Sequence, residues 1–110
     1  MTEKIQTIAI LGGTGDLGGG LARQWSRAGY QIYIGSRTID KGLAAASELL
    51  TEFPDLNVTG HDNISAAQLA DVVVLTVPFA HQLSTLESVK PALDGKVLID
   101  VTVPLVPPKV

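Results

Sequence analysis

A chain of 110 residues, of which 45% are hydrophobic, is long enough for one domain with a single core. Its formal net charge of −3 offers no electrostatic reason to expect a nucleic acid as partner. Cysteine is absent, which excludes disulfide scaffolds and thiolate metal sites and fits a cytoplasmic setting, and we predict no metal site. No apolar run reaches the ~18 residues of a membrane helix and no signal peptide is recognisable, so no membrane contact is expected.

The first part of the chain alternates between a short apolar run and a helical spacing. A β-branched run that stops at Gly12 predicts a buried strand over residues 5–11. A helix is predicted next, ended by Gly29 in a left-handed conformation. Residues 32–34 predict a second strand closed by Gly35. The apolar face of the helix, expected in the core, consists of Leu17, Leu21, Trp25 and Ala28.

The same alternation then repeats. Apolar spacings from Ile39 to Phe53 predict a helix that Pro54 stops. Residues 72–77 are almost all β-branched, as is typical of a central parallel strand covered on both faces. A helix over residues 83–89 and, after a turn at Gly95, a strand over residues 96–101 complete the pattern.

The segment between these elements is more polar. Residues 56–59 predict a short third strand, followed by a polar loop that contains Gly60, His61 and Asn63. A short helix is predicted over residues 65–69, with Ser65 as its N-terminal cap.

Strands that alternate with helices predict an α/β fold, a single three-layer α/β/α domain around a doubly wound, mostly parallel sheet. We assign this domain to residues 1–103. Residues 104–110 are rich in proline, and we interpret them as the start of a linker to an absent second domain.

The glycines after the first strand form a dinucleotide-binding motif, Gly13-Thr14-Gly15-Asp16-Leu17-Gly18. Gly13 permits a tight turn, Gly15 lets the backbone approach a pyrophosphate, and Gly18 lets helix and strand pack closely. The positive end of the helix then binds the phosphates. The alternative is a glycine-rich turn without a ligand. Thr14 either donates to a phosphate or serves the local turn, and Gly19 and Gly20 leave room for a close neighbour.

The end of the second strand carries the next diagnostic residues. An NAD-binding domain offers a carboxylate to the ribose 2′-hydroxyl at this place. Here the chain has Ser36 and Arg37, and Lys41 follows one helical turn later. A hydroxyl and two cations suit a 2′-phosphate, so this pattern favours NADP(H) over NAD(H), unless the loop is simply basic and solvated.

Residues that follow the fourth strand are also expected near a ligand, because ligands of open α/β sheets lie at the carboxyl ends of the strands. Pro78, Phe79 and His81 could form a wall beside the nicotinamide or its ribose. His81 could also titrate near a substrate, although a histidine at a helix start is more often merely exposed. For Asp100, a capping or solvated role is favoured over general-base work.

Four segments together resemble the NADP oxidoreductases that use the deazaflavin coenzyme F-420. They are the glycine motif, Gly35-Ser36-Arg37, the stretch from Val74 to Pro78, and Val103-Pro104-Leu105-Val106-Pro107. The resemblance implies a Rossmann-like NADP(H)-binding domain, with Val77 beside the strand-end residues of the cofactor site. It also implies direct hydride transfer between NADP(H) and the deazaflavin, with no obligatory acid–base side chain. Members of that family continue into a helical second domain, and Phe79 stands where relatives have tryptophan.

Two other functions stay open. One is an NADPH-dependent flavin or metal reductase that uses the same domain, and the other is a non-catalytic module that binds or senses NADPH. The resemblance implies that turnover also needs the second domain, which completes the deazaflavin site in that family. Under each alternative, apolar surface near residues 101–106 predicts homo-oligomer formation.

Overall fold

The computed structural model describes residues 7–12, 16–76 and 79–101, with the side chains of these ranges except at 16, 17 and 79–82. The described strands are all parallel and form one sheet in the order β3-β2-β1-β4-β5. Their bounds are β1 Thr7–Leu11, β2 Gln31–Ser36, β3 Val58–Asp62, β4 Val72–Leu75 and β5 Val97–Asp100.

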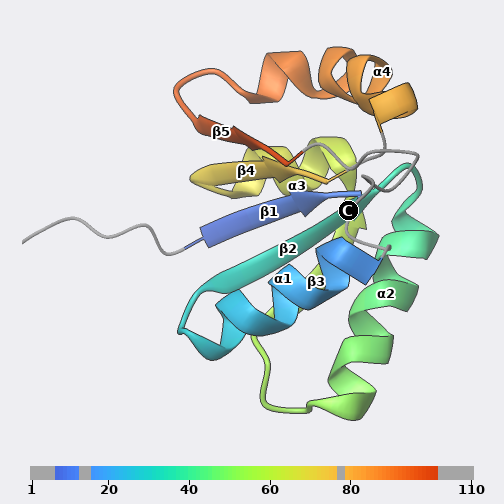
Figure 1. Ribbon diagram of the computed structural model, residues 1–110, viewed down its shortest axis with the longest axis vertical. Coiled ribbons are helices and arrows are strands. Elements are labelled where there is room, and N and C mark those ends of the chain that lie inside the picture. The colour runs from blue at the N-terminus through green and yellow to red at the C-terminus, as the bar shows by residue number, and fades with distance from the viewer. Residues whose placement is uncertain (1–6, 13–15, 77–78, 102–110) are drawn as a thin grey trace, which may run out of the picture.

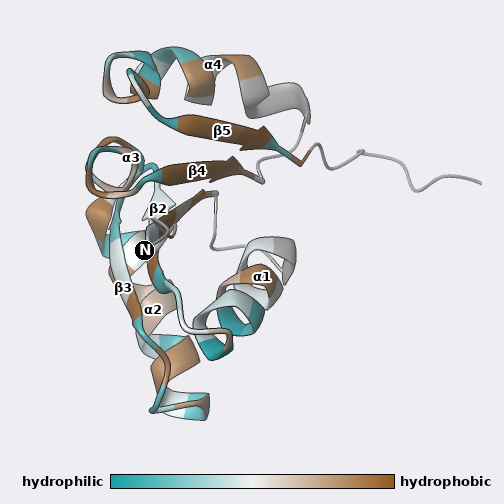
Figure 2. Cartoon of the chain, turned by 90° about the vertical axis from the view of Figure 1, so that its left-hand side faces the viewer, coloured by the Kyte–Doolittle hydropathy of each residue, from teal (hydrophilic) through white to brown (hydrophobic). Residues whose placement is uncertain are grey.

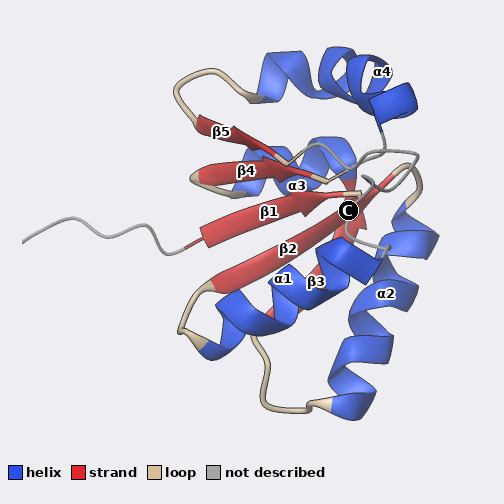
Figure 3. Ribbon diagram, in the orientation of Figure 1, coloured by secondary structure: helices blue, strands red, loops and turns tan. Residues whose placement is uncertain are grey.

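Helices connect consecutive strands and cover both faces of the sheet. Figure 1 shows α1 in front of the sheet and α3 behind it, and Figure 3 shows strand and helix alternating along the chain. This arrangement confirms the predicted doubly wound α/β fold. The helices are α1 Asp16–Arg27, α2 Ile39–Glu52, α3 Asn63–Leu69 and α4 Phe79–Val89, followed by the 3-10 helix η1 Lys90–Ala92.

Alternate residues of the strands belong to two separate core clusters, one on each face, as expected for a sheet covered on both faces. On one face, Ile10 and Val74 pack with Ala22 of α1 and Ala46 of α2. On the other face, Leu11 and Val73 belong to the cluster that contains Ala66 and Ala67 of α3 and Val89 of α4. The interior strand β4, which lies between β1 and β5, is buried along its whole length, as its β-branched sequence predicts.

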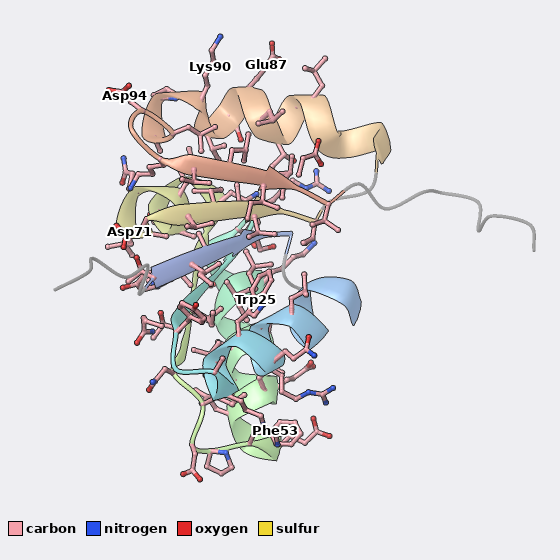
Figure 4. All side chains as sticks on the ribbon, turned by 60° about the vertical axis from the view of Figure 1, so that its left-hand side comes forward. Trp25, Phe53, Asp71, Glu87, Lys90 and Asp94 are labelled. Atoms are coloured by element: carbon pink, nitrogen blue, oxygen red, sulfur yellow. The ribbon has the colours of Figure 1, made fainter. Side chains whose placement is uncertain are left out.

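Two aromatic side chains hold α1 and α2 against the sheet (Figure 4). Trp25 is half-buried and packs on the core below α1, which confirms its predicted place. Phe53 follows α2 and lies beneath the guanidinium groups of Arg27 and Arg23, at 4.8 Å and 5.4 Å from its ring centre. Such cation–π contacts contribute roughly 0.5–1 kcal/mol at exposed sites.

The glycines of the second and third strands lie inside the strands rather than beyond them. The prediction that Gly35 closes β2 is wrong, because β2 continues to Ser36. The predicted loop at Gly60 and His61 is also wrong, because both residues belong to β3. A Cβ atom at Gly60 would overlap the backbone carbonyl of Gly42 in α2. This glycine therefore allows helix and strand backbones to touch, and it does not mark a turn.

The cap of α3 also differs from the prediction. The helix begins at Asn63, two residues earlier than expected, and Ser65 lies inside it. The capping side chain is that of Asp62, whose Oδ1 accepts a hydrogen bond of 2.7 Å from the backbone N–H of Ser65. Both residue types are good caps, so the choice depended on where β3 ends. By contrast, Gly29 has a φ of 107° after α1 and confirms the predicted helix end.

Strand β5 forms one edge of the sheet and is exposed on both faces. Val97, Leu98 and Ile99 are 55%, 40% and 44% exposed. Figure 2 shows this strand as a continuous hydrophobic stretch. A parallel strand is normally covered on both faces, so β5 is an unusually apolar surface. Within the described ranges, none of the helices has both the length and the apolar character needed to cross a membrane.

Candidate nucleotide site at the carboxyl ends of the strands

The site lies at the point in the sheet where successive strands stop being added on one side of β1 and start being added on the other. β1 has β2 on one side and β4 on the other, so the chain leaves β1 and β3 in opposite directions across the sheet. A crevice forms at the carboxyl ends of the strands at such a point. Hydrogen bonds tie the strand ends together there: the N–H of Gly12 donates to the carbonyl of Gly35 at 2.9 Å, and the N–H of Thr76 donates to that of Leu11 at 3.0 Å.

The glycine motif follows β1 directly. Gly13, Thr14 and Gly15 lie outside the described residues, and Asp16 and Leu17 begin α1. The described left-handed glycine at the strand exit is Gly12, with a φ of 78°. Gly18 is buried, and its role at a close helix–strand contact stays a prediction.

Gly19 and Gly20 have free space around them. A Cβ atom at each position would meet no described atom within 4 Å. The described part of the chain therefore supplies no close neighbour there, and the idea that they leave room for a ligand or another chain stays a prediction.

The predicted phosphate-binding residues lie together at the end of β2. Ser36 is the last residue of the strand and is buried, and Arg37 follows it with an exposed side chain. Thr38 caps α2, accepting a bond of 3.3 Å from the backbone N–H of Lys41. Lys41 therefore lies in the first turn of α2, where the helix dipole disfavours a cation unless an anion is bound nearby.

A carboxylate does lie beside this group, which the sequence alone did not indicate. In the parallel register, Asp62 at the end of β3 is the partner of Ser36 at the end of β2. Its Oδ1 is engaged by the N–H of Ser65 at the start of α3. The positive end of that short helix offsets part of its charge.

Asn63 is a second residue of the site that the sequence did not indicate, because it was predicted only as part of a polar loop. Its side chain is only 7% exposed, and its Oδ1 has no hydrogen-bond partner. The oxygen fills the space above Gly35, where a Cβ atom would lie 2.8 Å from it. A buried, unsatisfied amide oxygen costs about 1–3 kcal/mol, so it calls for an explanation.

A cavity of about 470 Å³ opens between Arg37, the β3–α3 junction and α4. Its walls include Asp62, Asn63 and Ile64, and hydroxyl side chains of α4 face it, among them Ser84. Ile64 is 46% exposed and offers an apolar surface. Pockets for small molecules have volumes of about 300–1,000 Å³ and combine apolar walls with a few polar groups, so this cavity fits a ligand.

Thr76 is a buried polar residue at the end of β4, and its hydroxyl donates to the carbonyl of Leu11 at 2.9 Å. This bond fixes the ends of β1 and β4 relative to each other at the crevice. The only sequence signal was a hydroxyl at the end of an otherwise apolar run.

The predicted wall after β4 is placed only in part. Val77 and Pro78 lie outside the described residues, and Phe79 and His81 belong to the first turn of α4, without described side chains. Asp100 is exposed at the carboxyl end of β5.

His61 lies within β3. Its Nε2 is 2.8 Å from the Thr59 hydroxyl and its ring meets Tyr33 edge-on at 5.4 Å, so it contributes to the sheet surface. Among the described residues, no group of three or more His, Asp and Glu side chains could hold a metal ion.

The fold and the site together define a dinucleotide-binding domain of the Rossmann type. Solved structures with the same arrangement include lactate dehydrogenase from Cryptosporidium parvum, with a TM-score of 0.71, 16% identity, and 92% of this chain and 38% of that chain covered. They also include pyrroline carboxylate reductase from Plasmodium falciparum with NADP bound, with a TM-score of 0.62, 22% identity, and 93% and 35% covered.

Sequence comparison is more specific. The family model described as "NADP oxidoreductase coenzyme F420-dependent" matches residues 7–104, and the chain belongs to this family. An F420-dependent NADP reductase from Methanothermobacter marburgensis is 52% identical over 100 residues, which cover 89% of this chain and 45% of the relative. The corresponding reductase from Methanocaldococcus jannaschii is 41% identical over 102 residues, with 89% and 45% covered. The chain thus spans about half the length of these relatives.

Proposed function

We propose that this chain is the NADP(H)-binding domain of an oxidoreductase that transfers hydride between NADP(H) and a deazaflavin acceptor. The observation that carries the proposal is the group at the end of β2. Ser36 and Arg37 stand where a carboxylate would serve NAD(H), and Lys41 adds a second cation at the start of α2. This group lies at the carboxyl edge of the sheet, the side on which ligands of such folds bind.

In this proposal the 2′-phosphate contacts Ser36, Arg37 and Lys41. The pyrophosphate lies on the glycine motif, at Gly13, Thr14, Gly15, Asp16, Leu17 and Gly18. The nicotinamide half runs toward Val77, Pro78, Phe79 and His81. No residue of the chain is assigned a catalytic role, because hydride transfer between two bound cofactors depends mainly on their positions.

Calorimetric titration with NADPH and NADH at one salt concentration tests the cofactor assignment. We expect NADPH to bind at least about tenfold more tightly, because charge-assisted hydrogen bonds contribute roughly 1.5–3 kcal/mol. Arg37→Ala should remove most of this preference and leave NADH binding unchanged. Lys90→Ala is the matched control. Lys90 precedes β5 and so lies on the side of the sheet where the strands begin, away from their carboxyl ends (Figure 4). Equal affinities, or no binding of either nucleotide, would contradict the assignment.

Asp62→Asn provides a sharper test of the same group. Asparagine caps helices as well as aspartate does, so α3 should be retained. Removing the carboxylate beside Ser36 should increase the affinity for NADPH several-fold and change that for NADH less. A decrease specific to NADPH would place the 2′-phosphate elsewhere.

The acceptor is proposed from the family and from the relatives' printed names. Mixing the chain with NADPH and oxidised deazaflavin should bleach the deazaflavin absorbance if these residues suffice for hydride transfer. Turnover with a flavin or ferric complex but not with the deazaflavin would favour the reductase alternative. NADPH binding without any turnover is what a binding or sensing module predicts.

Of the apolar surface predicted near residues 101–106, all but Val101 lies outside the described residues. We also propose that the protein acts in the cytoplasm and that its copies associate through the exposed surface of β5, which directly precedes that segment. The absence of cysteine supports the first statement, and the exposure of Val97, Leu98 and Ile99 supports the second.

A further inference from the structure

We propose that Thr76 is a positioning residue for the dinucleotide: its hydroxyl fixes the peptide group between Leu11 and Gly12, and thereby the start of the glycine motif that receives the pyrophosphate. This inference rests on the proposed function, and it extends that function from the 2′-phosphate to the pyrophosphate. Thr76 follows β4 directly and Gly12 follows β1 directly, so both residues lie at the carboxyl edge of the sheet.

Neighbouring strands hold this peptide group from both sides. On the β2 side, the N–H of Gly12 donates to the carbonyl oxygen of Gly35 at 2.9 Å. On the β4 side, the carbonyl oxygen of Leu11 accepts two hydrogen bonds from Thr76, one from its backbone N–H at 3.0 Å and one from its hydroxyl at 2.9 Å. Every residue type except proline has the N–H for the backbone bond. The hydroxyl bond is therefore the specific contribution of this side chain.

The hydroxyl bond restricts the orientation of the peptide group. A backbone carbonyl oxygen has two lone pairs, and the two donors of Thr76 match this capacity. Leu11 is fully buried and Thr76 is only 5% exposed, so water cannot readily replace a bond that is broken when the peptide group turns. Gly12 resists such a turn little, because it has a φ of 78° and glycine rotates at small steric cost. The direction in which the chain leaves β1 toward the glycine motif therefore depends on the Thr76 hydroxyl.

The same bond favours an anion at this edge of the sheet. Backbone N–H groups and the positive end of a helix attract a pyrophosphate, whereas carbonyl oxygens repel it. The Thr76 hydroxyl directs its positive hydrogen at the Leu11 oxygen and so reduces this repulsion. Both effects act on the pyrophosphate, which NADPH and NADH share, and neither acts on the 2′-phosphate proposed at Ser36 and Arg37. Loss of the hydroxyl should therefore weaken the binding of both dinucleotides equally.

Thr76→Val tests the proposal, because valine keeps the branched shape and lacks the hydroxyl. In calorimetric titrations at one salt concentration, we expect NADPH and NADH each to bind about three- to twelvefold more weakly, which corresponds to about 0.7–1.5 kcal/mol. The ratio of their affinities should stay within about twofold of that of the unaltered chain. Thr76→Ser keeps the hydroxyl and should restore both affinities.

Adenosine 2′-monophosphate separates positioning of the pyrophosphate from a general loosening of the site. It carries the 2′-phosphate but no pyrophosphate, and its binding can be followed by NMR titration. We expect the unaltered chain and Thr76→Val to bind it with equal affinity, because its contacts are proposed at the end of β2.

The matched control is Thr51→Val. The Thr51 hydroxyl also donates to a backbone carbonyl at 2.9 Å, that of Ser47, but it lies in the last turn of α2, away from the site. Its removal should leave every affinity unchanged. Far-ultraviolet circular dichroism and thermal melting check that each variant is folded. If Thr76→Val does not fold, the Gly12 amide resonance of the unaltered chain still decides the matter. It should shift with NADPH and NADH but not with adenosine 2′-monophosphate, and an unmoved resonance would overturn the proposal.

The outcomes separate this inference from the proposed function. Unchanged binding of NADPH and NADH by Thr76→Val would overturn the role of Thr76 and leave the NADP(H) assignment intact. An equal loss for adenosine 2′-monophosphate would show a general loosening of the site, and a loss for NADPH alone would place the effect at the 2′-phosphate. Either result would also overturn the inference. If the unaltered chain binds neither dinucleotide, the proposed function fails, and this inference fails with it.

Discussion

Gly35 and Asn63 are 28 residues apart in the chain, yet the Asn63 amide occupies the space that a side chain at Gly35 would need. A Cβ atom at Gly35 would lie 2.8 Å from Asn63 Oδ1 and 3.1 Å from its Cα. This contact joins the end of β2 to the start of α3, at the edge of the sheet that carries the candidate site. The pair explains why a glycine follows the β-branched and aromatic residues 32–34 inside this strand.

We therefore expect Gly35→Ala to be destabilising. The methyl group must displace Asn63 or shift α3, and overpacking of this kind costs about 1–3 kcal/mol. Urea unfolding followed by circular dichroism measures the change. A stability equal to that of the unaltered chain would show that the contact is easily relieved.

Gly20→Ala provides a contrast at a glycine with open surroundings. Gly20 lies in α1, and a Cβ atom there would meet no described atom. Alanine should stabilise the chain by up to about 1 kcal/mol, the difference in helix propensity. If Gly20 leaves room for the nucleotide, NADPH affinity should fall in the same variant. Unchanged affinity with higher stability would remove that role from Gly20.

Lys96 connects the start of β5 to the end of α3. Its Nζ donates hydrogen bonds to the carbonyls of Gln68 and Ala70, at 3.0 Å and 2.5 Å. Carbonyls at this negative end of a helix have no partner within the helix, so the lysine satisfies them. Lys96→Met keeps the apolar stem and removes both bonds, so we expect a loss of about 1–2 kcal/mol in urea unfolding. Lys90→Met, on the exposed 3-10 helix, should change stability by less than about 0.5 kcal/mol.

Self-association through β5 is the fourth prediction. Val97 and Ile99 pair in register with Val72 and Val74, which belong to the core cluster under α1 and α2. The two residues of β5 therefore extend this apolar face of the sheet past the part that α1 covers. Multi-angle light scattering over a range of concentrations should show a mass that rises above that of one chain.

Val97→Lys should restore the mass of a single chain, since it places a charge on the most exposed of the three apolar residues of this strand. Leu83→Lys is the control, because Leu83 is 70% exposed but lies on α4. A mass equal to one chain at every concentration would refute the prediction.

Local sequence patterns sufficed wherever one element's own periodicity decided the outcome. β1, α2 and β4 lie where the apolar spacings predicted them, and α1 ends before Gly29 as expected. The Ser36-Arg37 pair could also be placed at a strand end from its distance to the glycine motif. Nothing local indicated that Asp62 would pair with Ser36, because that neighbourhood exists only through the register of β2 and β3.

The sequence by itself determined the order of strands and helices, the parallel doubly wound class, and the residue types available for a dinucleotide. Those properties depend on periodicity and on short motifs, which act over a few residues. Only the tertiary structure decided the roles of Gly35, Gly42 and Gly60. At each position an atom from another helix or strand occupies the space that a Cβ atom would need. It also decided that Asp62 caps α3 and that Asn63 is buried beside the cavity. The physical reason is that steric exclusion and hydrogen-bond satisfaction depend on neighbours in space, which sequence spacing does not encode.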